Sequence, residues 1–153
     1  MLQNLYPHLL AFHGLFRWVV LAAALAAIFV ALSGWSGTKP ASTNLQWLSV
    51  IFVIAMDIEF LTGLVLYFVS PITRAALANI GEAMKVYEPR FFTVEHTALM
   101  FLAVICAHVG GALSRKGRTD LMKYRGAGIA YTISLLLMLS GIPWWRPLLK
   151  LSS

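Results

Sequence analysis

Charged residues are scarce in this sequence, and their scarcity argues against an ordinary soluble domain. Only 12% of the 153 residues are charged, whereas 59% are hydrophobic. A soluble domain has roughly 25% charged residues. The chain also has a single cysteine, Cys106, which excludes an internal disulfide and a cysteine-rich metal site.

Several common catalytic motifs are also missing. The sequence has no glycine-rich phosphate loop, no HExxH zinc motif and no Ser–His–Asp set. The segments between its apolar runs are too short to hold a nucleotide or peptide site. The net charge of +6 comes from basic residues that flank those runs, which is typical of membrane topology. We therefore expect no nucleic-acid partner.

What the sequence does contain is four long apolar runs, at residues 9–32, 47–69, 91–112 and 126–145. Each approaches or exceeds the roughly 20 residues that cross a bilayer as a helix. Continuous apolar runs span lipid as helices, because every backbone polar group is then satisfied internally. The sequence predicts one all-α domain, 1–153, that forms a four-helix transmembrane bundle. Residues 70–90 predict a short amphipathic helix at the membrane interface.

The distribution of basic residues predicts the orientation. Five of them lie in the short loop 113–126 against one acid, Asp120, so we expect this loop in the cytoplasm and both termini outside. The leading residues MLQNLYPH carry no positive charge, and no cleavage site follows. We therefore expect the first run to be a membrane span and not a cleaved signal peptide.

Seven histidine, arginine, aspartate or glutamate side chains fall within the predicted spans. Such residues are costly in lipid and commonly mark a functional interior. They are His13, Arg17, Asp57, Glu59, Glu95, His96 and His108.

The pair His13 and His96 is the main candidate site. The first and third spans run in the same direction, and each histidine lies roughly 6–8 Å below the start of its span at 1.5 Å per residue. Two imidazoles at one level can ligate a haem iron from separate helices of a bundle. An imidazole would also ligate a chlorophyll-type pigment. The alternative is that each histidine donates to a nearby backbone carbonyl or lies at the level of the lipid headgroups.

The remaining titratable residues predict ion pairs. Arg17 lies one helical turn below His13 and can pair with Glu59 or with a haem propionate. Asp57 and Glu59 point about 200° apart on their helix, so one must find another partner. A lone carboxyl there would suit a proton or quinol site. His108 lies about 120° around its helix from His96, and we expect it to be hydrogen-bonded. Asp57, Glu59 and His108 form a candidate proton or ion-pair site.

Four short motifs carry a family resemblance. They are HGLFRWVVL from His13, LTGLVLYFVSP from Leu61, FTVEHTALM from Phe92 and IPWWRPL from Ile142. Their order resembles a family of small four-helix bacterial membrane proteins labelled "cytochrome B", over nearly the whole chain. The resemblance implies a haem b protein of the bacterial inner (cytoplasmic) membrane that acts in electron transfer. Carried to this chain, it points to His13, Arg17, Glu95 and His96.

Three functional hypotheses follow. The first is a haem b-binding electron-transfer subunit, at most part of an oxidoreductase, with His13 and His96 as axial ligands. Arg17 would then hold a propionate, and Glu95 would hydrogen-bond near the ligands. Its partners would be the lipid bilayer with other membrane subunits or a quinone. The second is a cofactor-free accessory subunit of a respiratory or photosynthetic complex. The third is an ion or proton transporter that uses Asp57, Glu59 and His108.

Overall fold

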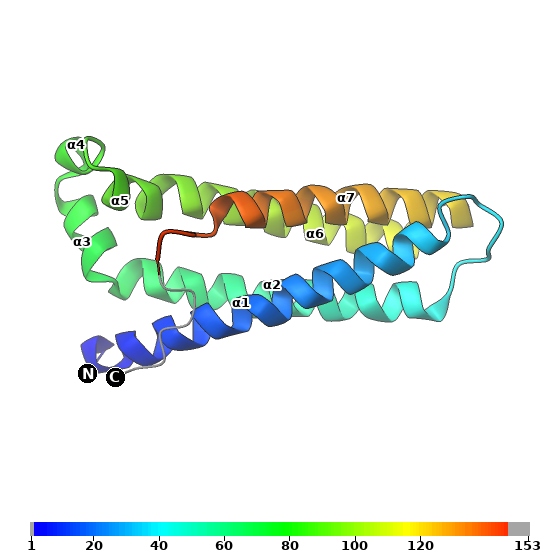
Figure 1. Cartoon of the computed structure of the whole chain (residues 1–153), viewed down its shortest axis with the longest axis horizontal. Helices are drawn as coiled ribbons and strands as arrows, with labels where there is room; N and C mark the ends of the chain where they lie inside the picture. Colours follow the sequence, from blue (N-terminus) through cyan, green and yellow to red (C-terminus); the bar gives the residue numbers. More distant parts are fainter. Residues whose placement is uncertain (1, 147–153) are drawn as a thin grey trace.

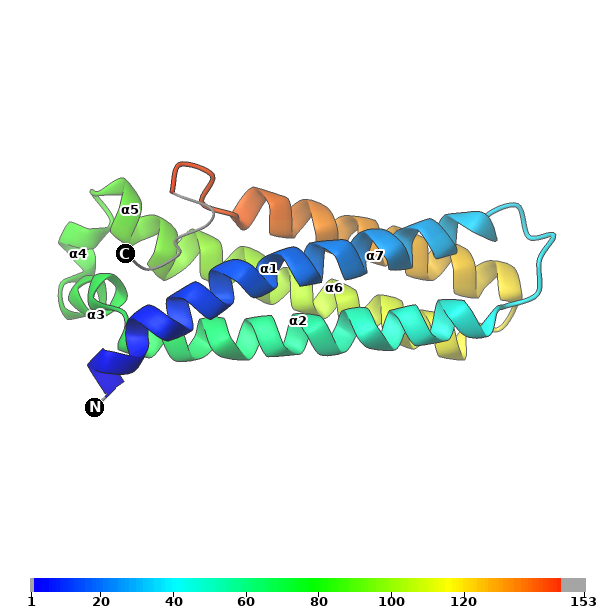
Figure 2. The ribbon, with the colours of Figure 1, turned by 60° about the horizontal axis from the view of Figure 1, so that its bottom comes forward.

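The computed structural model describes residues 2–146, which are helical almost throughout and contain no strand. The last two residues of the IPWWRPL motif lie outside this range. The long helices lie side by side (Figures 1 and 2). These are α1 (Leu2–Ser33), α2 (Thr43–Val69), α6 (His96–Lys116) and α7 (Asp120–Gly141). The predicted all-α fold class is therefore confirmed.

Short helices fill the connector between α2 and α6. They are α3 (Pro71–Ala78), α4 (Ile80–Ala83) and α5 (Tyr87–Arg90), followed by a π-helical turn, η1 (Phe91–Glu95). Figure 1 places α3, α4 and α5 together at one end of the bundle, which we call the cap end. The opposite end, where the α1–α2 and α6–α7 loops lie, is the loop end. The single amphipathic helix that the sequence predicts is thus divided into three.

A break at Asn79 causes the first of these divisions. Its backbone leaves the helical region (φ −144°, ψ 75°), and its side-chain oxygen accepts a hydrogen bond from the Glu82 amide at 3.4 Å. Asparagine favours such caps because its side chain competes with the helical hydrogen bond. The cap therefore ends α3 and begins α4.

Three helical segments are long and apolar enough to cross a membrane: Leu5–Ser33, Thr43–Val69 and Tyr87–Lys116. Their exposure pattern is the reverse of a soluble protein's. Phe29 and Phe68 are 73% and 63% exposed, whereas Ala24 and Ala27 are completely buried. Large apolar side chains that point outward and small ones that line helix contacts are typical of helices packed in lipid. The three segments indicate a multi-pass membrane protein.

The fourth long helix differs from the prediction in length and polarity. Among the described residues, α7 is not one of the helices that are long and apolar enough to span a membrane, and its first half carries Asp120, Lys123 and Arg125. It ends at Gly141, four residues before the predicted end. Pro143 disfavours the helical conformation of the residue before it, and Ile142 is accordingly extended (φ −73°, ψ 129°).

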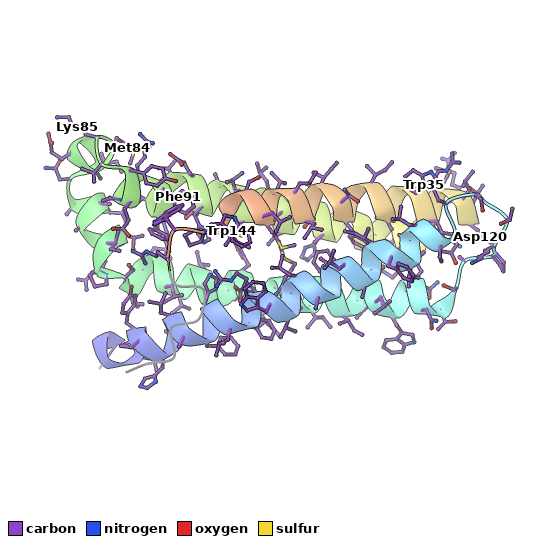
Figure 3. The ribbon with its side chains drawn as sticks, in the orientation of Figure 1. Trp35, Met84, Lys85, Phe91, Asp120 and Trp144 are labelled. Atoms are coloured by element: carbon purple, nitrogen blue, oxygen red, sulfur yellow. The ribbon has the colours of Figure 1, made fainter. Side chains whose placement is uncertain are left out.

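The loop end is held together by α7. The hydroxyl of Tyr124 donates to the carbonyl of Pro40 at 3.0 Å and accepts from the amide of Ser42 at 3.1 Å. Arg125 Nε donates to the Trp35 carbonyl at 3.1 Å. Figure 3 shows Trp35 at this end, opposite the cap. These contacts fix the α1–α2 loop against the start of α7.

Candidate functional site

A cavity of about 630 Å³ occupies the half of the bundle near the cap end. Its walls come from α1, α2, α3, η1, α6 and α7 and from the residues after α7, and most of them are apolar. Cofactor sites commonly have volumes of roughly 300–1,000 Å³ and a few polar groups on apolar walls. The polar and charged groups that line the cavity are His13, Arg17, Glu59, His96, Arg146, Tyr6, Tyr67, Ser70, Thr73 and Thr97.

The helix order brings His13 and His96 together. Both α1 and α6 pack against α2 and α7, so α1 and α6 stand at opposite corners of the bundle. His13 extends inward from α1 and His96 from α6. Their ring centroids are 6.3 Å apart, and the ring planes are 79° from parallel. The sequence interpretation required these two rings to face one another at one level, and they do.

The Nδ1 atoms of the two imidazoles face different groups. The Nδ1 of His96 lies 2.7 Å from the carbonyl oxygen of Gly141, to which it donates. This carbonyl belongs to the last residue of α7, where no helical amide remains to bond it. The Nδ1 of His13 lies 3.2 Å from Oε1 of Glu59, at ion-pair distance but without hydrogen-bond alignment. In each ring the other nitrogen, Nε2, is left for a further ligand.

Glu59 and Arg17 complete the polar part of the cavity. The side chain of Glu59 is only 13% exposed, and its Oε2 atom is buried without a hydrogen-bond partner. Arg17 lies close enough to attract the Glu59 carboxylate and also lies over the ring of Trp18, 5.6 Å from its centroid. The expected association of Arg17 with Glu59 thus includes His13 as a third member.

The π-helical turn η1 directly precedes His96. A π turn holds one more residue than an α turn and often lies at a functional site. Here it places the rings of Phe91 and Phe92 5.9 and 6.0 Å from the His96 ring. Trp145 packs on Phe91 with a centroid distance of 4.6 Å. Aromatic side chains therefore surround the His96 imidazole at the cap end.

Glu95 is not part of the cavity wall. Its Oε1 accepts a hydrogen bond from Arg90 Nε at 2.8 Å, and its side chain is 39% exposed. Adjacent residues on a helix point about 100° apart, which carries Glu95 away when His96 faces inward. The structure does not place Glu95 beside the two imidazoles, and we assign it no role there.

Asp57 and His108 are also separate from the cavity. His108 Nε2 lies 3.5 Å from Asp57 Oδ1, and the two side chains are 50% and 42% exposed on the outside of α2 and α6. Glu59 faces the cavity instead. The grouping of Asp57, Glu59 and His108 as one site is therefore not what the fold produces. The opposite directions of Asp57 and Glu59 do follow the helical angle that the sequence indicates.

Two features of the cavity were not anticipated from the sequence. Gly63 faces the His13 ring, and a Cβ added to it would lie 3.1 Å from His13 Cε1. Arg146, after α7, reaches the cavity wall and pairs with Glu88, whose Oε1 is 3.0 Å from Arg146 Nε. Gly63 was a readable signal, because it lies one helical turn after Glu59 on the same face of α2.

Among residues 2–146, no cluster of three or more His, Cys, Asp or Glu side chains is placed to hold a metal ion. The sequence matches no protein-family model, and no curated protein or solved structure matches the chain. The resemblance to the "cytochrome B" proteins therefore stays a prediction from the motifs.

Proposed function

We propose that the cavity binds one haem b, with His13 and His96 as axial ligands, and that the chain is a membrane electron-transfer subunit. The observation that supports this most directly is the pair of imidazole rings across the cavity, 6.3 Å apart, with His96 Nδ1 bonded to the Gly141 carbonyl and His13 Nδ1 beside Glu59.

The ring separation fits a shared metal. A metal–imidazole nitrogen bond is about 2 Å long, and each nitrogen lies about 1 Å from its ring centroid, so two rings on opposite sides of one metal have centroids roughly 6 Å apart. The observed centroid distance of 6.3 Å is close to that value. Ring pairs in direct edge-to-face contact also have centroids about 4.5–7 Å apart, so the separation supports the proposal only together with the positions of the two rings.

The surroundings of the rings also fit metal ligands. A ligating histidine usually donates its other nitrogen to a carboxylate or a backbone carbonyl, which fixes its orientation. Glu59 and the carbonyl of Gly141 stand at those positions. A bare metal ion needs about four protein donors, whereas a haem supplies four nitrogens of its own. The absence of a larger donor cluster in residues 2–146 favours the haem over a bare ion.

The charged residues of the cavity fit the periphery of such a group. Arg17 and Arg146 line the wall and can pair with carboxylates, and guanidinium is the best side-chain partner for a carboxylate. A haem with two histidine ligands has no open position for a substrate, so it supplies one-electron chemistry. The role of the chain is to hold the ligands, exclude water and neutralise charge.

The same proposal includes the membrane arrangement. We propose that α7 crosses the bilayer beside the three apolar helices, because it packs against α1 and α6 along the bundle. The basic loop between α6 and α7 favours the cytoplasmic side for the loop end. The cavity would then lie near the outer face of the inner membrane, within reach of a quinol or an extracytoplasmic electron carrier.

A reduced-minus-oxidised absorption spectrum tests the proposal. The full-length protein, expressed with ample haem and purified, should show a haem b band at about one haem per chain. His13→Ala and His96→Ala should each reduce bound haem at least tenfold, because each removes an axial ligand. His108→Ala, outside the cavity, is the matched control and should retain haem. A wild-type protein without a haem b band would overturn the proposal.

A further inference from the structure

The contact between Asp57 and His108 lies on the outside of the bundle. The Nε2–Oδ1 distance is 3.5 Å, and about half of each side chain is exposed. Large apolar side chains surround the pair one turn away on the same helices: Ile54 and Leu61 on α2 are 53% and 59% exposed, and Ile105 on α6 is 43% exposed. The pair is a polar spot on an otherwise apolar face.

This spot lies deep in the membrane-spanning region. Asp57 is near the middle of α2, roughly 20 Å from either end of the helix at 1.5 Å per residue. His108 lies roughly 12 Å from the loop end of α6. Ionisable side chains at such depth almost always face a protein interior or a water-filled cavity. In a single copy of the chain, this pair would face lipid.

Within residues 2–146, the hydrogen bonds of Asp57 and His108 leave acceptor sites of the carboxylate without a donor. His108 Nδ1 donates to the Val104 carbonyl at 3.0 Å, because a carbonyl can only accept. Nε2 is the ring nitrogen that faces the Asp57 carboxylate, 3.5 Å from Oδ1. A carboxylate has about four acceptor sites. Within the described part of the chain, Asp57 has no partner besides His108.

We propose that the α2–α6 face around Asp57 and His108 binds a second copy of this chain. A two-fold axis along the membrane normal keeps both copies at the same depth, so Asp57 of each copy meets His108 of the other. Acceptor and donor lie side by side at one level, and the face is therefore complementary to itself. A different subunit would need a matching donor and acceptor at that depth, which a second copy has necessarily.

The proposal is independent of the haem. The cavity faces the opposite side of α2, through Glu59 and Gly63. Dimerisation and haem binding should therefore respond to different substitutions. Failure of one proposal leaves the other intact.

Cysteine cross-linking in vesicles that contain only the purified full-length protein tests the interface. In a Cys106→Ala background, Ile105→Cys lies one turn from His108 and should give cross-linked dimers. Leu25→Cys on α1, which is 57% exposed, is the matched control and should stay monomeric. No dimer at Ile105→Cys, or equal dimer at both positions, would overturn the proposal, as would a cross-link in native membranes to a different protein alone.

A double variant tests the role of the polar pair. Asp57→Leu with His108→Leu should weaken dimerisation roughly tenfold, because two symmetry-related contacts are lost and each accounts for a factor of about three. Haem content should not change, since neither residue lines the cavity. Full dimerisation in a correctly folded double variant would contradict the assignment. If the double variant does not insert into the membrane, the difference in cross-linking between Ile105→Cys and Leu25→Cys still tests the interface.

Discussion

The two halves of the bundle differ in how closely their helices approach. At the loop end, glycine and alanine face large rings: Tyr131 is fully buried against Gly110, and Tyr124 packs over Gly34. At the cap end, the helices separate around a cavity of about 630 Å³. The same four helices thus provide a tight contact and an open one.

The difference in helix separation follows from the side chains that lie between the helices. Close helix approach in membranes depends on small side chains, and the loop-end stripe of α1 is Ala24, Ala27 and Ala31, each fully buried. At the cap end, the corresponding inward positions of α1 are His13 and Arg17. Dense packing in one half therefore supplies the cohesion that lets the other half stay hollow and polar.

A large side chain in the hollow half should impair cofactor binding and leave the fold intact. Gly63→Leu would push against the His13 ring and fill part of the cavity, so we expect haem content to fall at least tenfold. Helix propensity should favour the variant by about 1 kcal/mol, because glycine is replaced within α2. Haem absorbance per chain measures the first effect, and thermal unfolding of the haem-free protein measures the second.

Gly63→Ala provides a graded control. Its Cβ would lie 3.1 Å from His13 Cε1, so the ring must move by only a few tenths of an ångström. We expect a shifted haem spectrum with haem still bound. Unchanged haem content in Gly63→Leu would mean that the cofactor does not occupy this cavity.

A methyl group added in the closely packed half should instead destabilise the fold. Gly110→Ala places a methyl group against the Tyr131 ring, which is fully buried and cannot swing away. Overpacking of this kind costs about 1–3 kcal/mol. Gly14→Ala is the matched control, because no atom lies within 4 Å of its added Cβ, and it should stabilise α1 by up to about 1 kcal/mol. Thermal unfolding followed by circular dichroism should separate the two, and equal shifts would contradict the proposed tightness.

The smallest predicted effect concerns Asp120, at the aqueous edge of the tight half. A hydrogen bond from the Ala41 backbone and another from Lys123 hold the pKa of Asp120 below its usual value of 3.8. A lowered folded-state pKa stabilises the fold above the unfolded pKa, and that contribution is lost as pH falls through the folded pKa. The carboxylate is exposed, so the effect should be small. Asp120→Asn should therefore be slightly less stable than wild type at pH 7, and the gap should close as the pH falls through the folded-state pKa of Asp120. A gap that persists once the carboxyl is protonated would argue against this origin.

The helices were predictable because run length and rise per residue are fixed by the bilayer and the backbone. The same arithmetic predicted that His13 and His96 lie at one level. It also predicted that Asp57 and Glu59 point apart, and Glu59 indeed faces the cavity while Asp57 faces outward.

Other parts of the site depend on the rotation of each helix about its axis, which the spacing of residues in the sequence does not determine. Glu95 is adjacent to His96, yet it points to Arg90 and away from the cavity. The partner of His96 is the carbonyl of Gly141, a backbone group that no side-chain pattern reveals. Pro143 indicated that α7 ends early. The prediction placed the end at residue 145 because the apolar run continues past this proline.

The π-helical turn η1 changes the direction in which residues before α6 point, relative to the residues of α6 itself. Each residue of an α-helix contributes about 100° of rotation about the helix axis. The extra residue of a π turn therefore rotates the preceding side chains about that axis by roughly this angle. The ring cluster of Phe91 and Phe92 can thereby enclose His96, while the rest of α6 keeps the rotation that its contacts with α7 require. The offset therefore sets the direction in which the cap end leaves the axis of α6.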